Sequence, residues 1–370
     1  MADNIIQVDI AVLGAGLAGI AAALALKQHG LQVALIGEII GKGPKVGEFL
    51  PASVRRLFQA LQLDEPTDIL GKENYLQCNT KMSAWGSATW TYQDSLRDPE
   101  GGGWHILRHR FEQNLLKIAG DREVNHFQAK LLELSDNGVQ YRVRVDGEDG
   151  EITFQSPRLI DATGRKSWLV RRMDSPSKRQ NRQMAVIGWV NDTANETERA
   201  TKVKSVENGW WYTAPLPNRQ RVIAFHGLAE DVGILCKKPD RFLAQAQRCE
   251  LDVGLGAATV LSAPLQSCDA SLRLSSKVAG KRWLAIGDAA LALDPLSSQG
   301  MHFALYSAIM ASDAICKARQ NEATAFEAMQ TYCNQVSDVF VANQRTRHMF
   351  YNEERRYRSH HYWLDQCASF

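Results

Sequence analysis

The feature that most constrains this chain is a glycine-rich turn close to its N-terminus. The run GAGLAG, residues 14–19, follows an apolar stretch, residues 8–13, and opens an Ala-rich stretch with helical spacing, residues 17–29. Residues 31–36 form a second apolar stretch, so this region predicts a strand–helix–strand unit. In such a unit the glycines allow a tight turn, close approach of a pyrophosphate and packing of the helix on the sheet. The helix N-terminus is therefore expected to bind a dinucleotide.

An acidic residue at the end of the second strand usually binds the adenosine ribose in this kind of unit. Counted from Gly30, Gly37 occupies that position and Glu38 follows it. Two interpretations stay open. Either a shift of one residue lets Glu38 reach the ribose, or the contact is missing and Glu38 is a solvated loop acid.

Composition limits the other possibilities. The 370 residues are 45% hydrophobic and 23% charged, which excludes a disordered chain, a collagen and a coiled coil. The net charge of +2 gives no general attraction to nucleic acid or to a membrane. Seven scattered cysteines without CxxC, and histidines without HxH or HxxxH, predict neither a disulfide framework nor a metal site. With no secretory signal and no apolar window of about 18 residues, the expected location is the cytoplasm.

A second motif lies far along the chain. LAIGDAA, residues 284–290, is followed by DPLSSQGM, residues 294–301. This layout resembles the FAD-binding signature of the p-hydroxybenzoate-hydroxylase fold, and its DPLxSxG form is most similar to the flavin-dependent tryptophan-halogenase branch. The resemblance implies that Asp288 binds the ribityl chain and that backbone N–H groups near Gly300 and Met301 face the N1/C2=O edge of the flavin. A helix N-terminus there suits the negative charge of reduced flavin.

Shorter segments support the same resemblance. Arg108 opens a helix where the family places an arginine near the FAD phosphates, although a solvated helix-start arginine is equally compatible. IDATGR, residues 160–165, resembles the strand end beside the dinucleotide, and Glu48 follows Gly47 in a GE segment like that beside the flavin, or is an exposed loop acid. The residues expected to bind non-covalent FAD are Gly14, Ala15, Gly16, Leu17, Ala18, Gly19, Glu38, Glu48, Arg108, Leu131, Asp161, Gly164, Gly287, Asp288, Pro295, Gly300 and Met301.

The motifs predict an α/β fold with a Rossmann-like FAD-binding domain interleaved with an antiparallel-sheet substrate domain, and a helical C-terminus. Helices are expected at 51–61, 108–119 and 239–250, and a strand at 124–134. The predicted boundaries are residues 1–73, 93–183 and 270–320 for the FAD-binding domain, 74–92 and 184–269 for the sheet-rich substrate domain, and 321–370 for the C-terminal helical segment.

Four residues of the run GWWYTAPLP resemble the segment that lines the substrate side of the flavin: Trp210, Trp211, Tyr212 and Pro215. Aromatic strands are also often core, so both interpretations are kept.

The chain departs from the halogenases in several places. GGGWHILRHR, residues 101–110, replaces their WxWxIP segment, and a DATG run stands where hydroxylases carry the DG segment implicated in NADPH use. Lys81 lies near the position of the lysine that passes on oxidised halide but out of register, so an exposed strand lysine is the alternative. Halogenases also continue past this length with a helical cover, so a more open pocket is expected. The catalytic candidates are Lys81 and Glu48.

A compact chain with these motifs also resembles the flavoproteins encoded beside quinone-cofactor oxidases such as lysine ε-oxidase and glycine oxidase. That resemblance implies an FAD-dependent monooxygenase that hydroxylates a tryptophan of the oxidase precursor while its cysteine tryptophylquinone is made. Its partners would be the precursor, O2 and an electron donor or flavin reductase. The alternatives are a flavin-dependent tryptophan halogenase, a reductase of isoprenoid double bonds, and an FAD-stabilised maturation chaperone without turnover.

One segment carries an unusual charge. Residues 164–184 hold seven Lys and Arg side chains against Asp174 alone. Three interpretations stay open: a solvated loop, a docking surface for an acidic partner, or a phosphate contact.

Overall fold

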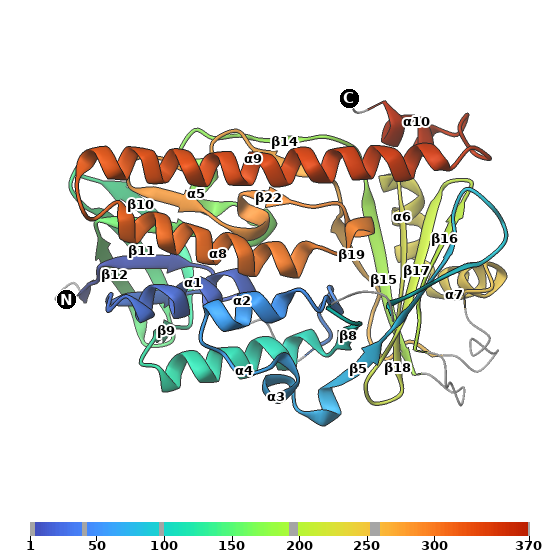
Figure 1. Ribbon diagram of the computed structural model, residues 1–370, viewed down its shortest axis with the longest axis horizontal. Coiled ribbons are helices and arrows are strands. Elements are labelled where there is room, and N and C mark those ends of the chain that lie inside the picture. The colour runs from blue at the N-terminus through green and yellow to red at the C-terminus, as the bar shows by residue number, and fades with distance from the viewer. Residues whose placement is uncertain (1–3, 39–42, 96–99, 192–198, 252–259, 369–370) are drawn as a thin grey trace.

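The computed structural model describes residues 4–38, 43–95, 100–191, 199–251 and 260–368 (Figure 1). Its first layer is a parallel five-stranded sheet in the order β21–β13–β2–β3–β9. The central strands are continuous apolar runs because both faces of this sheet are covered. The strands are β2 (Ile10–Leu13), β3 (Val33–Ile36), β9 (Asn125–Phe127), β13 (Arg158–Asp161) and β21 (Trp283–Ala285).

Helices α1 (Leu17–Gln28) and α8 (Gly300–Lys317) lie side by side on one face of the parallel sheet (Figure 1). Both are rich in buried alanine, which lets them pack closely, and Ser312 of α8 donates to the carbonyl of Ala22 at 3.5 Å. Helix α4 (Arg108–Asp121) also packs against α1. The other face is covered by β1 (Ile5–Gln7), β10 (Ala129–Asp136), β11 (Tyr141–Gly147) and β12 (Gly150–Ser156), which form a four-stranded sheet.

A seven-stranded sheet in the order β19–β15–β18–β17–β16–β6–β7 forms the other half of the molecule (Figure 1). Its pairs are antiparallel except for β16 with β6. The strands are β6 (Thr80–Ala84), β7 (Thr91–Asp94), β15 (Met184–Asn191), β16 (Thr201–Val206), β17 (Gly209–Leu216), β18 (Gln220–Gly227) and β19 (Gln266–Asp269).

The two faces of the seven-stranded sheet pack against different partners. Its outer face is covered by α6 (Ala229–Cys236) and α7 (Pro239–Arg248), with Trp211 and Phe242 in the shared core. We call the opposite face, which carries Tyr212 and Ala214, the inner face, because it packs against Val46 and Leu107 of the first half. A small sheet of β4 (Phe49–Leu50), β5 (Tyr75–Cys78) and β8 (Gly103–Ile106) lies between the halves and contacts β17.

Helix α9 (Glu322–Glu353) runs along the whole molecule, from the parallel sheet to the seven-stranded sheet (Figure 1). It begins at Asn321, whose side chain accepts from the Thr324 N–H at 2.9 Å. Helix α10 (His361–Cys367) folds back on it. In the part of the chain that the structure describes, no helix is long and apolar enough to cross a membrane. Shorter elements are α2 (Val54–Ala60), α3 (Pro66–Leu70), α5 (Trp168–Arg172), β14 (Ser177–Arg179), β20 (Arg273–Ser275) and β22 (Leu291–Ala292).

The predicted α/β fold class is confirmed, as are the helices expected at 108–119 and 239–250. The single strand expected at 124–134 is wrong. It divides at residue 128, because β9 joins the parallel sheet while β10 turns into the four-stranded sheet. The helix expected at 51–61 begins only at Val54. The domain boundaries stay a prediction.

Candidate flavin site

The glycine-rich turn joins β2 to α1, and each glycine has a separate geometric reason. Gly14 adopts a φ of +113°, and a Cβ there would lie 2.3 Å from the Ala162 carbonyl oxygen. A Cβ on Gly19 would lie 1.8 Å from the Gly14 oxygen. Gly16, by contrast, has nothing within 4 Å of its Cβ position and no side chain caps the first amides of α1. The first backbone N–H groups of α1 are therefore uncapped by any side chain and face unfilled space, which fits a diphosphate. Ala15, Leu17 and Ala18 belong to the same turn.

Crowding explains why the ribose position lacks an acid. A Cβ on Gly37 would lie 2.6 Å from the Ala15 backbone nitrogen, so no side chain fits there without moving the turn. Glu38 is the first position after β3 that can carry a carboxylate, and it is exposed. Its ribose contact stays a prediction.

Arg108 lies at the start of α4 and reaches back to the segment before β4. Its guanidinium donates to the Val46 carbonyl at 2.6 Å and to Glu112 Oε1 at 2.9 Å. Glu112 also pairs with Lys45. Burial alone would raise the pKa of Glu112, but the two cations outweigh it and hold the pKa below its usual value. This cluster fixes Arg108 against Gly47, and its role toward the FAD phosphates stays a prediction.

Asp161 ends β13 and is fully buried. Its Oδ1 accepts from the N–H and hydroxyl of Thr163, and its Oδ2 accepts from the N–H groups of Leu169 and Val170 at 2.8 and 2.9 Å. All four donors belong to this chain, so the carboxylate shapes the turn at Gly164 rather than projecting from it. Leu131, in β10, packs against the main apolar core. The cofactor roles of Asp161, Gly164 and Leu131 stay predictions.

The second motif follows β21. Gly287 has a φ of +53° and donates its N–H to Ser307 Oγ of α8 at 2.9 Å. The neighbouring Asp288 side chain is 41% exposed and its Oδ2 lies 3.7 Å from Arg165 Nε. Arg165 thus holds the Asp288 carboxylate in place, while part of it stays accessible to accept hydrogen bonds from a ligand, as a residue that binds the ribityl chain must.

The loop before α8 is anchored by a buried network that sequence reasoning missed. Asp294 Oδ1 accepts from the Leu296 N–H at 3.0 Å, and Oδ2 accepts from Arg347 Nε of α9 at 3.0 Å, with both side chains almost fully buried. Tyr351 and Gln183 complete the network through a hydrogen bond of 2.9 Å. Asp294 and Pro295 were part of the predicted flavin signature, but no pattern linked them to α9.

At the end of this loop, α8 begins with open amides. No side chain caps it from Gln299, and nothing lies within 4 Å of the Cβ position of Gly300. Met301 is buried beneath the first turn, and Pro295 opens the preceding 3-10 turn. The free N–H groups and the helix dipole would favour negative charge at this point, which fits the N1 edge of reduced flavin.

Glu48 lies just before β4, between the two halves of the molecule, and only 5% of it is exposed. Its Oε1 has no hydrogen-bond partner among the described residues. Burial raises the pKa of this carboxyl to about 7, against the lowering effects of backbone N–H groups and Arg108. Tyr212 of the inner face is close enough for Glu48 to raise its pKa further, after burial has raised it. Glu48 is therefore a buried acid that is free to exchange a proton.

Lys81 is an exposed residue of β6 on the inner face. Its Nζ lies 4.8 Å from the centre of the Phe49 ring, which places it over the residue after Glu48. A neighbouring polar pair is formed by His105 and Thr201, with Nε2 of His105 2.8 Å from Oγ1 of Thr201. Burial, with the charges of Arg221 and Lys81, lowers the pKa of His105 to about 3, so the ring is neutral.

The four substrate-side candidates divide between the two faces of β17. Tyr212 lies on the inner face beside Glu48. Trp210 shares that face but is buried in an aromatic cluster with Tyr351 and Trp363 of the C-terminal helices, stacked 3.7 Å from His226. Trp211 packs against α7 on the outer face, and Pro215 follows the same alternation. Trp211 and Pro215 thus point away from the predicted flavin position, and the structure explains them as core.

The tryptophan halogenase family model matches residues 73–368, and the model Glucose inhibited division protein A matches residues 9–61. The chain belongs to the tryptophan halogenase family. It is accordingly an FAD-dependent oxidoreductase. The open amides of α1 and α8 and the accessible Asp288 fit FAD.

Relatives of this tryptophan halogenase family member match along nearly all of it. LodB of Marinomonas mediterranea, named as an FAD-dependent oxidoreductase, is 26% identical over 97% of both chains. The flavin-dependent halogenase armH3 of Armillaria mellea is 24% identical over 91% of this chain and 72% of its own length.

Two solved structures share the fold. The flavin-dependent halogenase CmlS superposes with a TM-score of 0.82 and 19% identity, covering 94% of this chain, which spans 64% of the CmlS chain. The structure described as "Peptidyl tryptophan dihydroxylase QhpG essential for tryptophylquinone cofactor biogenesis" has a TM-score of 0.77 and 21% identity, covering 98% of this chain and 79% of that one.

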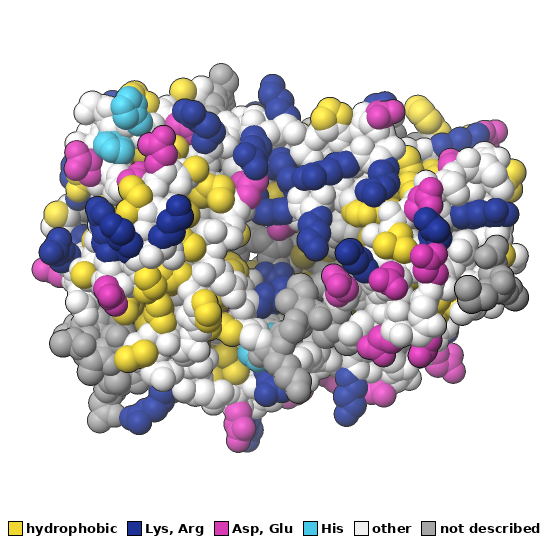
Figure 2. Space-filling model, turned by 180° about the vertical axis from the view of Figure 1, so that it is seen from behind, with side chains coloured by type: hydrophobic (Ala, Val, Ile, Leu, Met, Phe, Trp, Pro, Cys, Tyr) yellow, Lys and Arg dark blue, Asp and Glu magenta, His cyan; other side chains and the backbone are white. Residues whose placement is uncertain are grey.

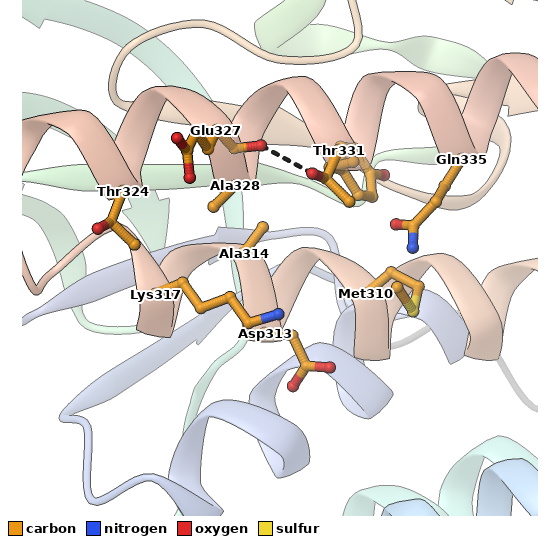
Figure 3. A pocket seen from close by; sticks show the side chains of 10 residues that line it. Met310, Asp313, Ala314, Lys317, Thr324, Glu327, Ala328, Thr331 and Gln335 are labelled. Atoms are coloured by element: carbon orange, nitrogen blue, oxygen red, sulfur yellow. Dashed lines mark hydrogen bonds between the residues drawn. The ribbon is translucent and has the colours of Figure 1, made fainter.

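The described residues also line two further cavities. One, of about 210 Å³, lies between α8 and α9, with Lys317 and Glu327 on its walls (Figure 3). Its lining residues belong to none of the motifs, and the hydrogen bond drawn in its wall lies within α9, where the Thr331 hydroxyl donates to the Glu327 carbonyl at 2.8 Å. The other, of about 530 Å³, adjoins Arg165. Across the described residues, no three His, Cys, Asp or Glu side chains gather as a metal site.

Proposed function

We propose that this chain is an FAD-dependent monooxygenase that hydroxylates a tryptophan side chain of a precursor protein during tryptophylquinone biogenesis. Its partners are that precursor, O2, and an electron donor or flavin reductase. The likeness to QhpG, described as a peptidyl tryptophan dihydroxylase, supports this substrate class. The full-length match to LodB supports a compact oxidoreductase of this size.

The observation that carries the proposal is the position and state of Glu48. It is buried between the predicted flavin position and the inner face, with one oxygen that has no partner in the described chain and a pKa of about 7. Hydroxylation of an indole carbon forms a C–O bond and breaks a C–H bond, so a nearby base must accept the released proton. A carboxyl group with a pKa near neutrality is suited to that task.

FAD, when bound and reduced, supplies with O2 the oxygen atom that enters the ring, while the second oxygen leaves as water. The electron donor provides the two electrons that this stoichiometry requires. The chain's own residues do the rest. Tyr212 and Phe49 form apolar walls that exclude water and orient the indole, and Glu48 Oε1 takes the proton. No side-chain nucleophile is needed.

The test is to incubate holoenzyme, reduced by a flavin reductase, with O2 and a quinone-oxidase precursor or with free tryptophan. Mass spectrometry should find a gain of about 16 or about 32 Da on a precursor tryptophan. Glu48→Gln should lower kcat by about a hundredfold with KM unchanged, whereas Glu65→Gln, at an exposed acid paired with Arg55, should not. The wild-type rate should fall below about pH 7, as Glu48 becomes protonated. Efficient turnover of free tryptophan without precursor modification contradicts the proposal.

A halogenase is the second candidate, because Lys81 lies on the inner face near Glu48 and Phe49. With chloride present, this function predicts a gain of about 34 Da on an indole. Lys81→Met would then abolish that product but leave hydroxylation intact. The chaperone alternative predicts a third result, a precursor that matures equally well without O2 or reductant.

Two further properties are proposed with this function. FAD is held without a covalent bond, so denaturation should release all of it. The protein works in the cytoplasm, which its seven free cysteines support, since reducing compartments keep thiols unpaired.

A further inference from the structure

The basic segment seen in the sequence folds into the wall of a cavity. The cavity of about 530 Å³ lies where the turn after Gly164 and α5 meet β14, β19 and β20. On the face of the molecule turned away in Figure 1, Lys and Arg side chains gather around the middle (Figure 2). Among the described residues, one carboxylate, Asp269, lines the cavity. The cations that line it are Arg165, Lys166, Arg171, Arg172, Arg179 and Arg273.

The two cations at the base of the cavity differ: Arg165 lies 3.8 Å from Asp269 and 3.7 Å from Asp288, whereas Arg273 contacts no carboxylate of the described residues. Arg273 is only 6% exposed, and its guanidinium donates to the Arg165 carbonyl at 2.6 Å and to Ser167 Oγ at 3.2 Å, with no carboxylate in contact among the described residues. Burial, followed by the nearby charge of Arg165, lowers the pKa of Arg273, against the raising effects of Asp269 and Asp288. Asp269 is already paired with Arg179 at 2.9 Å. A buried cation without a counterion is costly, so an anion entering this cavity would be stabilised.

The rim adds further cations. Lys166 and Arg171 are exposed and make no ion pair within the described chain, and Arg172 stacks on Trp168 with its Cζ 3.7 Å from the ring centre. Stacking holds the planar guanidinium in one orientation, which favours bidentate binding of phosphate oxygens. The volume is that of a small-molecule site rather than of a flat protein interface. Of the three interpretations of the basic segment, this geometry favours a phosphate contact.

The cavity also adjoins the predicted flavin position. Arg165 contributes to its wall and at the same time lies 3.7 Å from Asp288, the expected ribityl ligand. An anion that draws Arg165 into the cavity would therefore weaken its contact with Asp288. A ligand here and the flavin would be coupled through one side chain.

We propose that this cavity binds the diphosphate group of a nucleotide while FAD occupies its own site. Arg273 and Arg165 form the base of the site, and Lys166, Arg171 and Arg172 close around the phosphates. The proposal stands independently of the substrate that the enzyme oxidises. Two sources share this chemistry, a nicotinamide dinucleotide and a second molecule of flavin adenine dinucleotide.

Isothermal titration of the FAD-loaded protein with inorganic pyrophosphate and with ADP tests the site without using activity. Both should bind, and the double variant Lys166→Ala/Arg171→Ala should bind each at least about tenfold more weakly, because two charged contacts are lost. Both side chains are exposed, so the variant should fold normally. Lys178→Ala is the matched control. It removes an exposed cation of the same segment that does not line the cavity, and it should leave the affinity within about twofold.

Titrations of the FAD-loaded protein with NADPH and with a further excess of FAD then distinguish the two sources, because only the physiological dinucleotide should bind more tightly than ADP. Three results would overturn the proposal. They are no binding of pyrophosphate or ADP at millimolar concentration, equal weakening by the double variant and by Lys178→Ala, and binding of an acidic peptide without any nucleotide. The last result would assign the surface to an acidic protein.

Discussion

Asp161 and Glu48 are both buried carboxylic acids, but their surroundings are opposite. Asp161, at the carboxyl end of β13, accepts four hydrogen bonds from Thr163, Leu169 and Val170. Glu48, between the two halves, leaves Oε1 without a partner in the described chain. Burial raises the pKa of both, although the hydrogen bonds oppose it strongly at Asp161. The first carboxylate is committed to structure, and the second remains available for proton transfer.

Asp294 resembles Asp161, because it is also a buried carboxylate that is hydrogen-bonded within the chain. Its two oxygens accept from the Leu296 N–H and from Arg347, so the loop that leads into α8 is held by the C-terminal helix α9. Asp161 and Asp294, two buried carboxylates of the dinucleotide half, are thus both held by partners within the chain. Glu48 is the exception, because its Oε1 has no partner in the described chain. Variants of the paired acids and of Glu48 should therefore differ in their effects.

The largest effect on stability is expected at Asp294, a buried carboxylate whose oxygens are both paired within the chain. Arg347→Met leaves the Asp294 carboxylate buried without its cation, and the free energy of unfolding should fall by about 3–5 kcal/mol. Denaturant unfolding followed by circular dichroism measures it. Arg355→Ala, at an exposed arginine in the same region, is the control and should cost less than about 0.5 kcal/mol. Equal, small losses in the two variants would show that the network does not hold the loop.

Glu48 should behave in the opposite way. Its pKa is about 7 in the folded protein and 4.5 for an unperturbed carboxyl, so the folded state holds the proton more tightly. Folding stability is therefore lost as the pH rises from about 4.5 through 7, by about 3 kcal/mol in total. Glu48→Gln does not titrate, so its stability relative to wild type should increase over this pH range by about that amount. Denaturant titrations at several pH values measure the difference in unfolding free energy between the two proteins. If that difference does not change with pH, Glu48 does not have a raised pKa in the folded protein.

A third carboxylate, Asp288, lies between these extremes, since it is partly exposed and held only by Arg165 at 3.7 Å. Asp288→Ala should weaken FAD binding by about 1.5–3 kcal/mol, because one charged hydrogen bond to the ribityl chain is lost. Fluorescence titration of the apoprotein with FAD gives the dissociation constant. Asp68→Ala, in helix α3, serves as the control. If both variants bind FAD like the wild type, Asp288 is not the ribityl ligand.

The sequence predicted the parts of this molecule that depend on local patterns. Gly14 and Gly19 have conformational and packing requirements that few other residues meet, and Gly16 leaves open space, so the turn and the helix after it were evident. The apolar runs of the parallel sheet and the helix at 108–119 followed from periodicity in the same way. The division of residues 124–134 between two sheets was missed, because both halves have the same strand pattern and only tertiary pairing separates them.

The site was less predictable because its partners come from distant segments. The sequence suggested Glu48 either as an acid beside the flavin or as an exposed loop acid, but only the packing of the inner face shows that it is buried. Likewise Trp210, Trp211 and Tyr212 are adjacent in sequence, yet strand alternation sends Trp211 to the opposite face. Arg347 gave no local signal, because its partner Asp294 lies in another element.

The smallest effect on FAD binding is expected at Glu38. This residue tests whether an acid one position after the usual one still binds the adenosine ribose. Gly37 cannot be replaced, because a Cβ there would lie 2.6 Å from the Ala15 backbone nitrogen, so Glu38 is the first available carboxylate after β3. It is exposed, and a hydrogen bond to a ribose hydroxyl from an exposed carboxylate competes with water. Glu38→Ala should therefore weaken FAD binding by about 1 kcal/mol, or roughly fivefold. Glu38→Gln should restore part of the loss, because its carbonyl oxygen can still accept. An unchanged dissociation constant in both variants would show that this chain binds the adenosine ribose without an acid, and that the diphosphate turn and Asp288 carry the affinity.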